Sequence, residues 1–187
     1  MASIREAQSR LHTEMSSALG TEGPSDSEAF HNYVNSSGTF LAACVAESSR
    51  VRPVAAFSVP QAPPTDRVVG GFRIPGGTSV MVDAYALNVR NSFWGAAQDS
   101  ASFRPERWET LKASETRYQM WRFGFGPRVC MGRHIAEKML RVVLALLVWN
   151  SELGLKGRGL EGGGSFDTDP ASWITHPDVS VECRPRR

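Results

Sequence analysis

The chain has 187 residues, of which 41% are hydrophobic and 21% are charged, and its formal net charge is +2. This composition is ordinary for a globular domain, which at this length buries about 70% of the surface of its unfolded chain, and it excludes a disordered polymer. The balance of 21 basic and 19 acidic residues, without a long basic run, gives no indication of a nucleic-acid partner.

The three cysteines, Cys44, Cys130 and Cys183, are far apart in the sequence. An odd and scattered set does not suggest a disulfide framework, so we expect an intracellular, reducing compartment. The amino-terminal residues lack the apolar centre of a signal peptide, and the longest apolar run, 142–149, is too short to cross a bilayer. We therefore expect no membrane anchor in this chain.

Residues 1–53 are predicted to be helical. A capping box at residues 3–6 begins a first helix, whose apolar face consists of Ile4, Ala7, Leu11 and Met15. Residues 25–28 can cap a second, short helix that leads to Tyr33. A third helix begins near Phe40 and must end before Pro53, because proline disfavours the helical conformation in the residue that precedes it.

Residues 54–84 have the pattern of a β-sheet segment. Residues 54–59 and 78–84 alternate or concentrate apolar side chains as strands do, and residues 67–74 predict two short strands around Gly70 and Gly71. Residues 85–131 follow as a meander that leads into a loop around Cys130. Aromatic side chains recur along the meander, so we expect it to be ordered.

Residues 132–150 are predicted to form a long helix. The second half of this helix is apolar all round, which predicts deep burial. Residues 151–187 are predicted to form a Gly-rich loop and a terminal hairpin, in which Trp173 and Ile174 pair with residues 179–183.

The residues around Cys130 are the most informative part of the chain. Residues 121–134 read WRFGFGPRVCMGRH and contain the pattern F-G-x-G-x-R-x-C-x-G directly before the long helix. The amino terminus of a helix and the cation of Arg128 both stabilise a thiolate, which is the form of cysteine that binds metals. The other positions suit a ligand beside the sulfur: Gly126 permits a turn, Gly132 permits close approach of a flat ligand, and Phe123 and Phe125 can exclude water. A buried, inert cysteine is the alternative interpretation.

This string resembles the haem-binding loop of the cytochromes P450, the haem-thiolate monooxygenases. The resemblance implies that Cys130 is the proximal axial ligand of haem iron and that Arg128 faces a haem propionate. It also implies that Trp121 lies at the haem edge and donates to a propionate, although an ordinary core tryptophan would fit the sequence equally well.

A second pattern lies upstream of the loop. Glu47-Ser-Ser-Arg50 places a carboxylate and a guanidinium on one helical face, and Pro105-Glu-Arg107-Trp108 follows. An isolated pair of this kind contributes only about 0.2–0.5 kcal/mol and is common on helix surfaces. The order of the patterns, however, resembles the carboxy-terminal half of cytochromes P450. That resemblance implies a buried structural cluster of Glu47, Arg50 and Arg107, whereas three unrelated surface charges would be the alternative.

The resemblance covers nearly the whole chain and implies one partial cytochrome P450 domain over residues 1–187, with an α+β, mainly helical fold. No string like A-G-x-D-T, which marks the oxygen-activating helix of the family, occurs in the 187 residues. We therefore expect this chain alone to bind haem weakly without hydroxylating, and to expose an apolar surface that favours association. Residues 55–57, and also Trp173 and Ile174, correspond to stretches that line the substrate pocket in the family, although ordinary packing explains them as well.

Three functions are consistent with these patterns. The first is a haem-thiolate monooxygenase that oxidises an apolar small molecule and receives electrons from an NADPH-dependent reductase. The second is a non-enzymatic remnant that binds haem, and the third is a structural module in which Cys130 binds nothing. Residues 87–95 and 117–128 are similar to fungal enzymes of secondary metabolism, including those that make sulfur-bridged diketopiperazines. Full-length relatives are often anchored to the endoplasmic reticulum.

Overall fold

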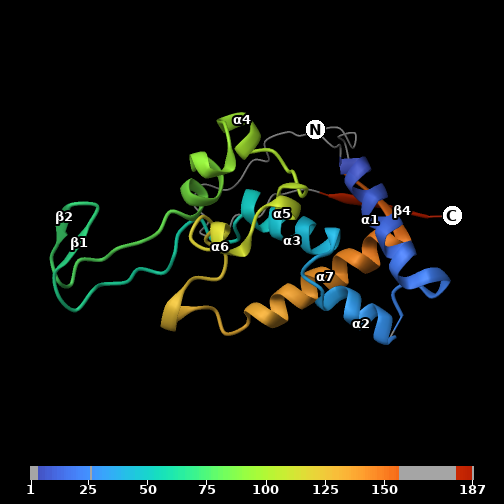
Figure 1. The fold of residues 1–187 in the computed structure, drawn as a ribbon, viewed down its shortest axis with the longest axis horizontal. Helices are drawn as coiled ribbons and strands as arrows, with labels where there is room; N and C mark the ends of the chain where they lie inside the picture. Colours follow the sequence, from blue (N-terminus) through green and yellow to red (C-terminus); the bar gives the residue numbers. More distant parts are fainter. Residues whose placement is uncertain (1–3, 26, 156–179, 187) are drawn as a thin grey trace.

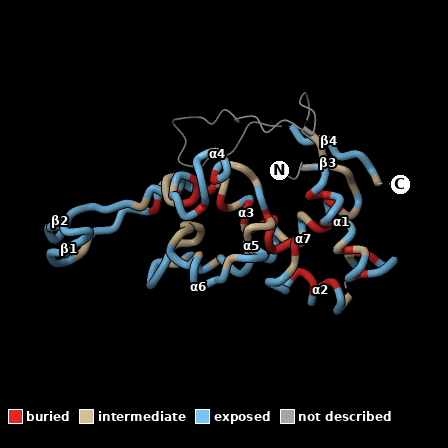
Figure 2. Tube along the Cα trace, turned by 45° about the horizontal axis from the view of Figure 1, so that its top comes forward, coloured by how far each residue is buried: buried red, intermediate tan, exposed pale blue. Residues whose placement is uncertain are grey.

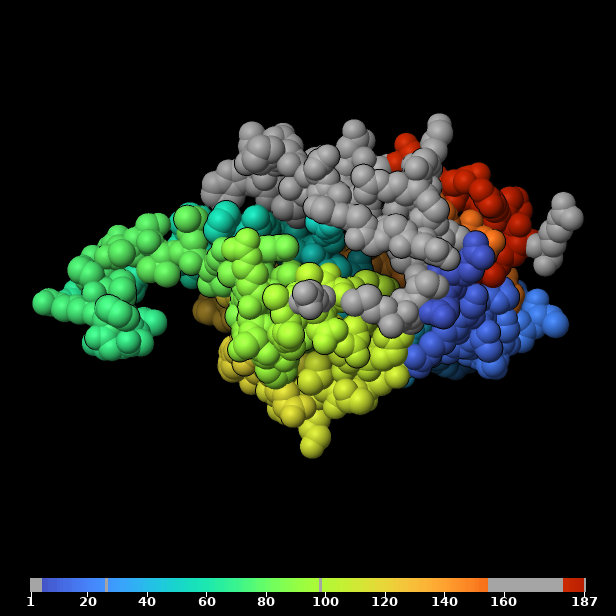
Figure 3. All heavy atoms as spheres, turned by 90° about the horizontal axis from the view of Figure 1, so that it is seen from above, coloured from blue at the N-terminus to red at the C-terminus, as the bar shows by residue number. Residues whose placement is uncertain are grey.

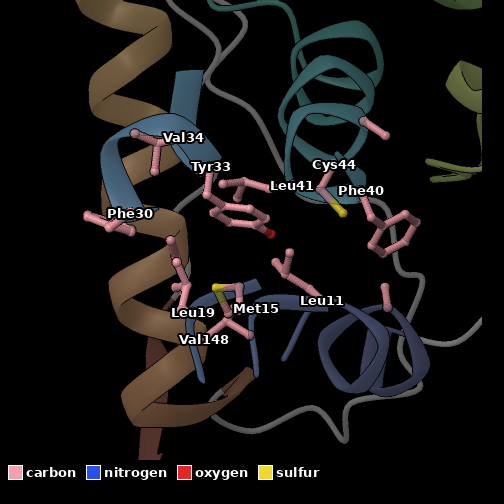
Figure 4. Packing of buried hydrophobic residues seen from close by; sticks show 13 residues of the cluster. Leu11, Met15, Leu19, Phe30, Tyr33, Val34, Phe40, Leu41, Cys44 and Val148 are labelled. Carbon is pink, nitrogen blue, oxygen red and sulfur yellow. The ribbon is translucent and has the colours of Figure 1, made fainter. Parts of the chain in front are cut away.

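A group of four helices forms the centre of the protein in the computed structural model, which describes residues 4–25, 27–155 and 180–186. These helices are α1 (Ile4–Leu19), α2 (Glu28–Asn35), α3 (Phe40–Val51) and α7 (Arg133–Asn150) (Figure 1). Each contributes apolar side chains to one buried cluster, and Figure 4 shows them gathered on both sides of the Tyr33 ring. The labelled members are Leu11, Met15, Leu19, Phe30, Tyr33, Val34, Phe40, Leu41, Cys44 and Val148. Of the apolar face predicted for the first helix, Ala7, Leu11 and Met15 are therefore confirmed as buried.

Side-chain caps explain where α2 and α3 begin. The hydroxyl of Ser27 accepts a hydrogen bond from the Phe30 N–H (3.3 Å), and that of Thr39 accepts one from the Ala42 N–H (3.1 Å). The carboxylate of Glu14 on α1 also accepts from the Phe40 N–H (2.7 Å) and from the Tyr33 hydroxyl (2.6 Å). One side chain of α1 thus fixes both α2 and the start of α3. The capping box predicted for the first helix includes Ser3, which lies outside the described residues.

The turn after α1 brings a glycine against an aromatic ring. The short helix η1 (Gly20–Glu22) ends at Gly23, which has a φ of +62° and lies against the indole of Trp149 on α7. A Cβ atom at Gly23 would overlap that ring, whereas Gly20 has a similar φ of +63° and open space around it. At Gly23 the positive φ is combined with a ψ of −157°, a conformation found almost only in glycine.

Replacement of Gly23 by alanine is expected to destabilise the chain more than replacement of Gly20. Both changes place a side chain at a positive φ, at a cost of about 1–3 kcal/mol. Gly23→Ala adds overlap with Trp149, which typically costs a further 1–3 kcal/mol or so. Urea unfolding measures the difference, and equal losses of stability in the two variants would show that the Trp149 ring does not constrain this position.

The segment between α3 and the meander projects from the helical group as a long arm. Its tip is the antiparallel hairpin of β1 (Arg67–Val69) and β2 (Phe72–Ile74), as predicted, and both strands are exposed (Figures 2 and 3). The segments predicted as strands at 54–59 and 78–84 pair antiparallel through a few backbone hydrogen bonds, but they form only isolated bridges, Phe57–Asp83 and, just beyond the first segment, Gln61–Val80, so regular strands there are wrong. Within the described chain, each of these two segments pairs only with the other. Prolines at 60, 63 and 64 also lack the backbone N–H that a β-ladder needs, so no regular ladder forms.

The meander consists of short helical turns that surround α3 (Figure 1). In chain order they are η2 (Ala86–Arg90), η3 (Ser92–Trp94), α4 (Ala97–Ser100), α5 (Arg107–Thr110) and α6 (Ala113–Thr116). Trp94 is buried here, and its indole packs against the ring of Trp108 (5.6 Å between centroids). The aromatic residues therefore order this segment, as the sequence predicts.

The long helix α7 has the predicted length but not the predicted burial. Ala145 and Val148 are buried, whereas Val143, Leu146 and Leu147 are 51%, 39% and 41% exposed. The expectation of burial on all sides is wrong, because α1, α2 and α3 cover only one side of α7 among the described residues.

The strand after α7 closes a small second sheet. β3 (Ser151–Leu155) pairs antiparallel with β4 (Val181–Pro185). The predicted terminal strand thus exists, but its partner directly follows α7, while Trp173 and Ile174 lie outside the described residues. The amide of Gln8 on α1 accepts from the Leu153 N–H (2.8 Å) and donates to the Leu153 carbonyl (2.9 Å), as a neighbouring strand would. Helices joined to two small antiparallel sheets confirm the predicted α+β, mainly helical class.

Candidate functional site

A fully buried ion pair joins α3 to the meander. The Arg50 guanidinium donates through Nε and Nη2 to the two carboxylate oxygens of Glu47, at 2.9 and 2.8 Å, and both side chains are 0% exposed. Arg107 adds a third contact, from its Nε to Glu47 Oε1 at 3.0 Å. The structure thus brings together the three residues that the sequence assigned to a structural cluster, across 60 residues of chain.

Neighbouring groups form further hydrogen bonds with the charged side chains of this cluster. Trp108 Nε1 and the Arg104 backbone N–H both donate to Glu47, each at 2.9 Å. Arg50 also donates to three backbone carbonyls of the meander, those of Asn88 (2.8 Å), Ser100 (2.6 Å) and Ser102 (3.2 Å). The sequence patterns assigned Trp108 no role in the cluster. They also did not predict the three carbonyls bound by Arg50, because backbone groups leave no side-chain pattern in the sequence.

The ionised form of Glu47 is favoured by its partners. Burial alone would raise the pKa of this carboxyl, but hydrogen bonds and charge from Arg50, together with the Arg104 N–H and Arg107, hold the pKa below its usual value. Breaking a buried charge pair by removing one partner costs several kcal/mol. The cluster therefore joins the meander to α3 through buried contacts that are costly to break.

The loop that carries Cys130 is shaped by two glycines and a short helical turn. Gly124 and Gly126 have φ angles of +77° and +66°, so the turn predicted at Gly126 is confirmed. The turn η4 (Gly126–Arg128) follows, and the Cys130 N–H then donates back to the carbonyl of Phe123 at 2.8 Å. Cys130 lies three residues before the first residue of α7, so the loop presents the thiol at the amino terminus of a long helix.

The thiol itself is exposed. Sequence reasoning expected Phe123 and Phe125 to shield the sulfur, but the described structure shows other partners for both rings. Phe125 packs on Trp121 at 5.3 Å between centroids, and the Arg122 guanidinium lies 4.7 Å from the Phe123 ring centre. The thiol is therefore exposed beside these rings, and the shielding of a ligand-bound sulfur by Phe123 and Phe125 stays a prediction.

The other expected ligand residues lie along the same loop. Arg128 is exposed at the end of η4, and Gly132 precedes α7. A Cβ atom on Gly132 would meet only the Cys130 sulfur, at 3.9 Å, so no side chain there occupies the space beside the thiol. Trp121 is half-buried, and its backbone N–H and C=O are both bonded to the side chain of Asn88.

The loop is also anchored to α7 through Glu137. This carboxylate accepts from Arg141 (2.9 Å), four residues further along α7, and from Arg122 (3.4 Å) in the loop. Burial lowers the pKa of Arg122, while Glu137 opposes that shift. Arg122 and Glu137 line a hollow of about 530 Å³ between the meander, the loop and α7. His134, which the sequence gave no ligand role, is exposed and accepts a hydrogen bond from Arg133.

The other cysteines differ from Cys130 in their surroundings. Cys44 is buried in the core between the helices, and burial, followed by the nearby Glu106 and Glu14 carboxylates, raises its pKa to about 12. Such a thiol stays protonated and inert. Cys183 is exposed on β4, outside any loop of this kind.

Comparison with known sequences agrees with this site. The Cytochrome P450 family model matches residues 1–159, which include both the buried cluster and the Cys130 loop. The chain belongs to the cytochrome P450 family. This P450 chain is 48% identical over its whole length to the cytochrome P450 monooxygenase aclC of Aspergillus oryzae, of which it covers 36%. It is 46% identical over 98% of its length to asaD of Aspergillus flavus, covering 33% of that protein. It is 38% identical over 99% of its length to gliC of Aspergillus fumigatus, covering 34%.

The P450 chain thus spans about a third of the length of the curated relatives that it matches. Its similarity to fungal monooxygenases confirms the resemblance that the sequence patterns indicated. Among the described residues, no helix is both long and apolar enough to cross a membrane.

Haem is the cofactor that this family implies, and the loop fits it. The described residues contain no group of three His, Cys, Asp or Glu side chains that could hold a bare metal ion. Haem iron needs only an axial ligand from the protein, and a cysteine thiolate is one of the groups that supply it. Met131, Ile135 and Met139, directly after the thiol, are 98%, 67% and 60% exposed, and such an apolar surface suits a porphyrin.

Proposed function

We propose that the chain forms the cysteine-bearing part of a fungal cytochrome P450 monooxygenase that oxidises an apolar small molecule in secondary metabolism. In this proposal Cys130 is the axial ligand of haem iron, Arg128 pairs with a haem propionate, and Trp121 lies at the haem edge. Electrons come from an NADPH-dependent reductase, the redox partner that the family generally uses. The monooxygenase names of the relatives support the reaction class.

One observation carries the proposal: an accessible thiol stands on a glycine-shaped loop beside an exposed apolar helix surface. When bound, haem supplies the chemistry by which oxygen is activated. The residues of this chain do the rest. The hydrogen bond from the Cys130 N–H to the Phe123 carbonyl fixes the backbone that carries the sulfur, and Gly132 leaves room beside it. The buried Glu47 cluster keeps the meander, from which the loop arises, in place.

The test is to load the 187-residue chain with haemin and to record the spectrum of the reduced, CO-bound form. A thiolate-type Soret band is expected, and Cys130→Ala should abolish it because the axial sulfur is removed. Cys183→Ala removes an exposed thiol outside the loop and should leave the band unchanged. Retention of the thiolate band by Cys130→Ala would overturn the ligand assignment.

A second measurement separates the monooxygenase from a haem-binding remnant. The sequence encoded upstream of Met1 is determined, and an in-frame segment like A-G-x-D-T supports the enzyme. The same longer polypeptide should oxidise small apolar compounds with NADPH and a reductase, whereas the 187-residue chain should not, because the string is absent from its residues. Haem binding without turnover in the longer polypeptide would favour the remnant.

A further inference from the structure

We propose that Asn88 is a positioning residue that couples the buried Glu47–Arg50 pair to the Cys130 loop. The coupling itself is a property of the described residues, and its meaning for haem rests on the function proposed above. Asn88 is 0% exposed and lies in η2, a single π-helical turn, the kind of irregular turn that often marks functional positions.

The side chain of Asn88 brackets one residue of the loop. Its Nδ2 donates to the Trp121 carbonyl at 2.9 Å, and its Oδ1 accepts from the Trp121 N–H at 2.7 Å. A carboxamide is suited to this because it offers a donor and an acceptor side by side. The bracket therefore replaces the strand partner that Trp121 would have in a sheet.

The backbone carbonyl of Asn88 contacts the buried cluster rather than the loop. Its carbonyl accepts from Arg50 Nη1 at 2.8 Å, so one residue contacts both the buried cluster and the loop. Two residues beyond Trp121, the carbonyl of Phe123 accepts from the Cys130 N–H at 2.8 Å. Hydrogen bonds thus link Arg50 to Asn88, Asn88 to Trp121, and Phe123 to Cys130, and the backbone between Trp121 and Phe123 joins the last two links.

Nearby contacts hold Gln119, two residues before Trp121. Asn91 Nδ2 donates to Gln119 Oε1 at 2.9 Å, and Trp94 Nε1 donates to the Gln119 carbonyl at 3.1 Å. Trp94 also contacts the cluster, because its carbonyl accepts from Arg107 Nη1 at 3.1 Å, whereas the Asn91 side-chain contact involves neither Trp121 nor the cluster. Asn91 therefore provides a matched control of the same residue type in the same segment.

Hydrogen exchange of the chain without haem tests the coupling. In Asn88→Ala, exchange at the Trp121 and Cys130 amides should rise about tenfold or more, because loss of the bracket lets the loop open locally. Amides of α1 and α3 in the core should keep their rates. Asn91→Ala should leave the Trp121 and Cys130 amides unchanged. If Asn88→Ala does not fold, Asn88→Asp is measured instead, since it keeps the acceptor for the Trp121 N–H but loses the donor.

Two results would overturn the proposal. Faster exchange at Trp121 with no change at Cys130 would show that the path ends at the bracket. An equal rise at all amides would show that Asn88 serves only global stability. The reduced, CO-bound spectrum is also recorded after haemin loading, and Asn88→Ala should lower the fraction of haem that gives the thiolate-type Soret band. Because exchange is read without haem, failure of haem binding in the parent chain would count against the proposed function and leave the coupling test intact.

Discussion

Replacing Arg50 with alanine is expected to lower the free energy of unfolding by about 3–5 kcal/mol. The change removes two hydrogen bonds to Glu47 and leaves that carboxylate 0% exposed with fewer partners. It also deprives three meander carbonyls of their donor. Such a loss is a large part of the stability of an ordinary domain, so the midpoint of urea unfolding should fall markedly. Unfolding is followed by circular dichroism on the 187-residue chain.

The matched control for this experiment is Arg104→Ala. Its guanidinium pairs with Asp99 at 3.3 Å at the surface, where ion pairs contribute about 0–1 kcal/mol, and its backbone contact to Glu47 does not depend on the side chain. Its stability should therefore stay close to that of the parent chain. If Arg50→Ala proves no more destabilising than Arg104→Ala, the buried cluster does not hold the meander.

Acidification should remove the same stabilisation from the parent chain. Because the folded-state pKa of Glu47 lies below its usual value of 4.5, the ionised carboxylate stabilises the fold fully above about pH 4.5. This contribution is lost as the pH falls through the lower, folded-state pKa. At pH 7, Glu47→Gln should be less stable than the parent chain by roughly 3 kcal/mol, since Arg50 loses its counter-charge. The gap should narrow steadily on acidification below pH 4.5.

The comparison of unfolding free energies at several pH values provides the measurement. Glu109→Gln is the control, because Glu109 pairs with Arg10 at the surface and is 42% exposed there. Its curve should run parallel to that of the parent chain. A gap between Glu47→Gln and the parent chain that stays constant down to pH 3 would contradict the assigned role of the Glu47 charge.

The patterns that could be predicted are those in which side-chain types recur at fixed spacing. The helices follow from the apolar periodicity of α1 and α7, and the Cys130 loop and the Glu47 cluster follow from short strings that resemble one family. Gly126 is the clearest example, because the sequence pattern requires a turn and the backbone has a φ of +66°. A local backbone conformation and a short family pattern both depend on residues that are close together in the sequence, so both can be predicted from it.

The features that escaped prediction depend on partners that no local pattern reports. The bracket of Asn88 on Trp121 joins residues 33 positions apart, and the three carbonyls held by Arg50 have no side-chain signal. The strands expected near Phe57 and Val80 lacked enough partners to form ladders. The burial expected for α7 failed for the same reason, because a helix that is apolar all round is covered only where other elements reach it.

The bidentate contact between Gln8 and Leu153 has a consequence for how the chain folds. It joins residues 145 positions apart, and it links α1 to the strand that follows α7. At a synthesis rate of about 5–20 residues per second, α1 emerges roughly 7–30 s before that partner. During this interval Gln8 on α1 has no Leu153 backbone with which to form its hydrogen bonds. Contacts of such long sequence separation also slow folding in general, so α1 should reach its final packing only after Leu153 has been synthesised.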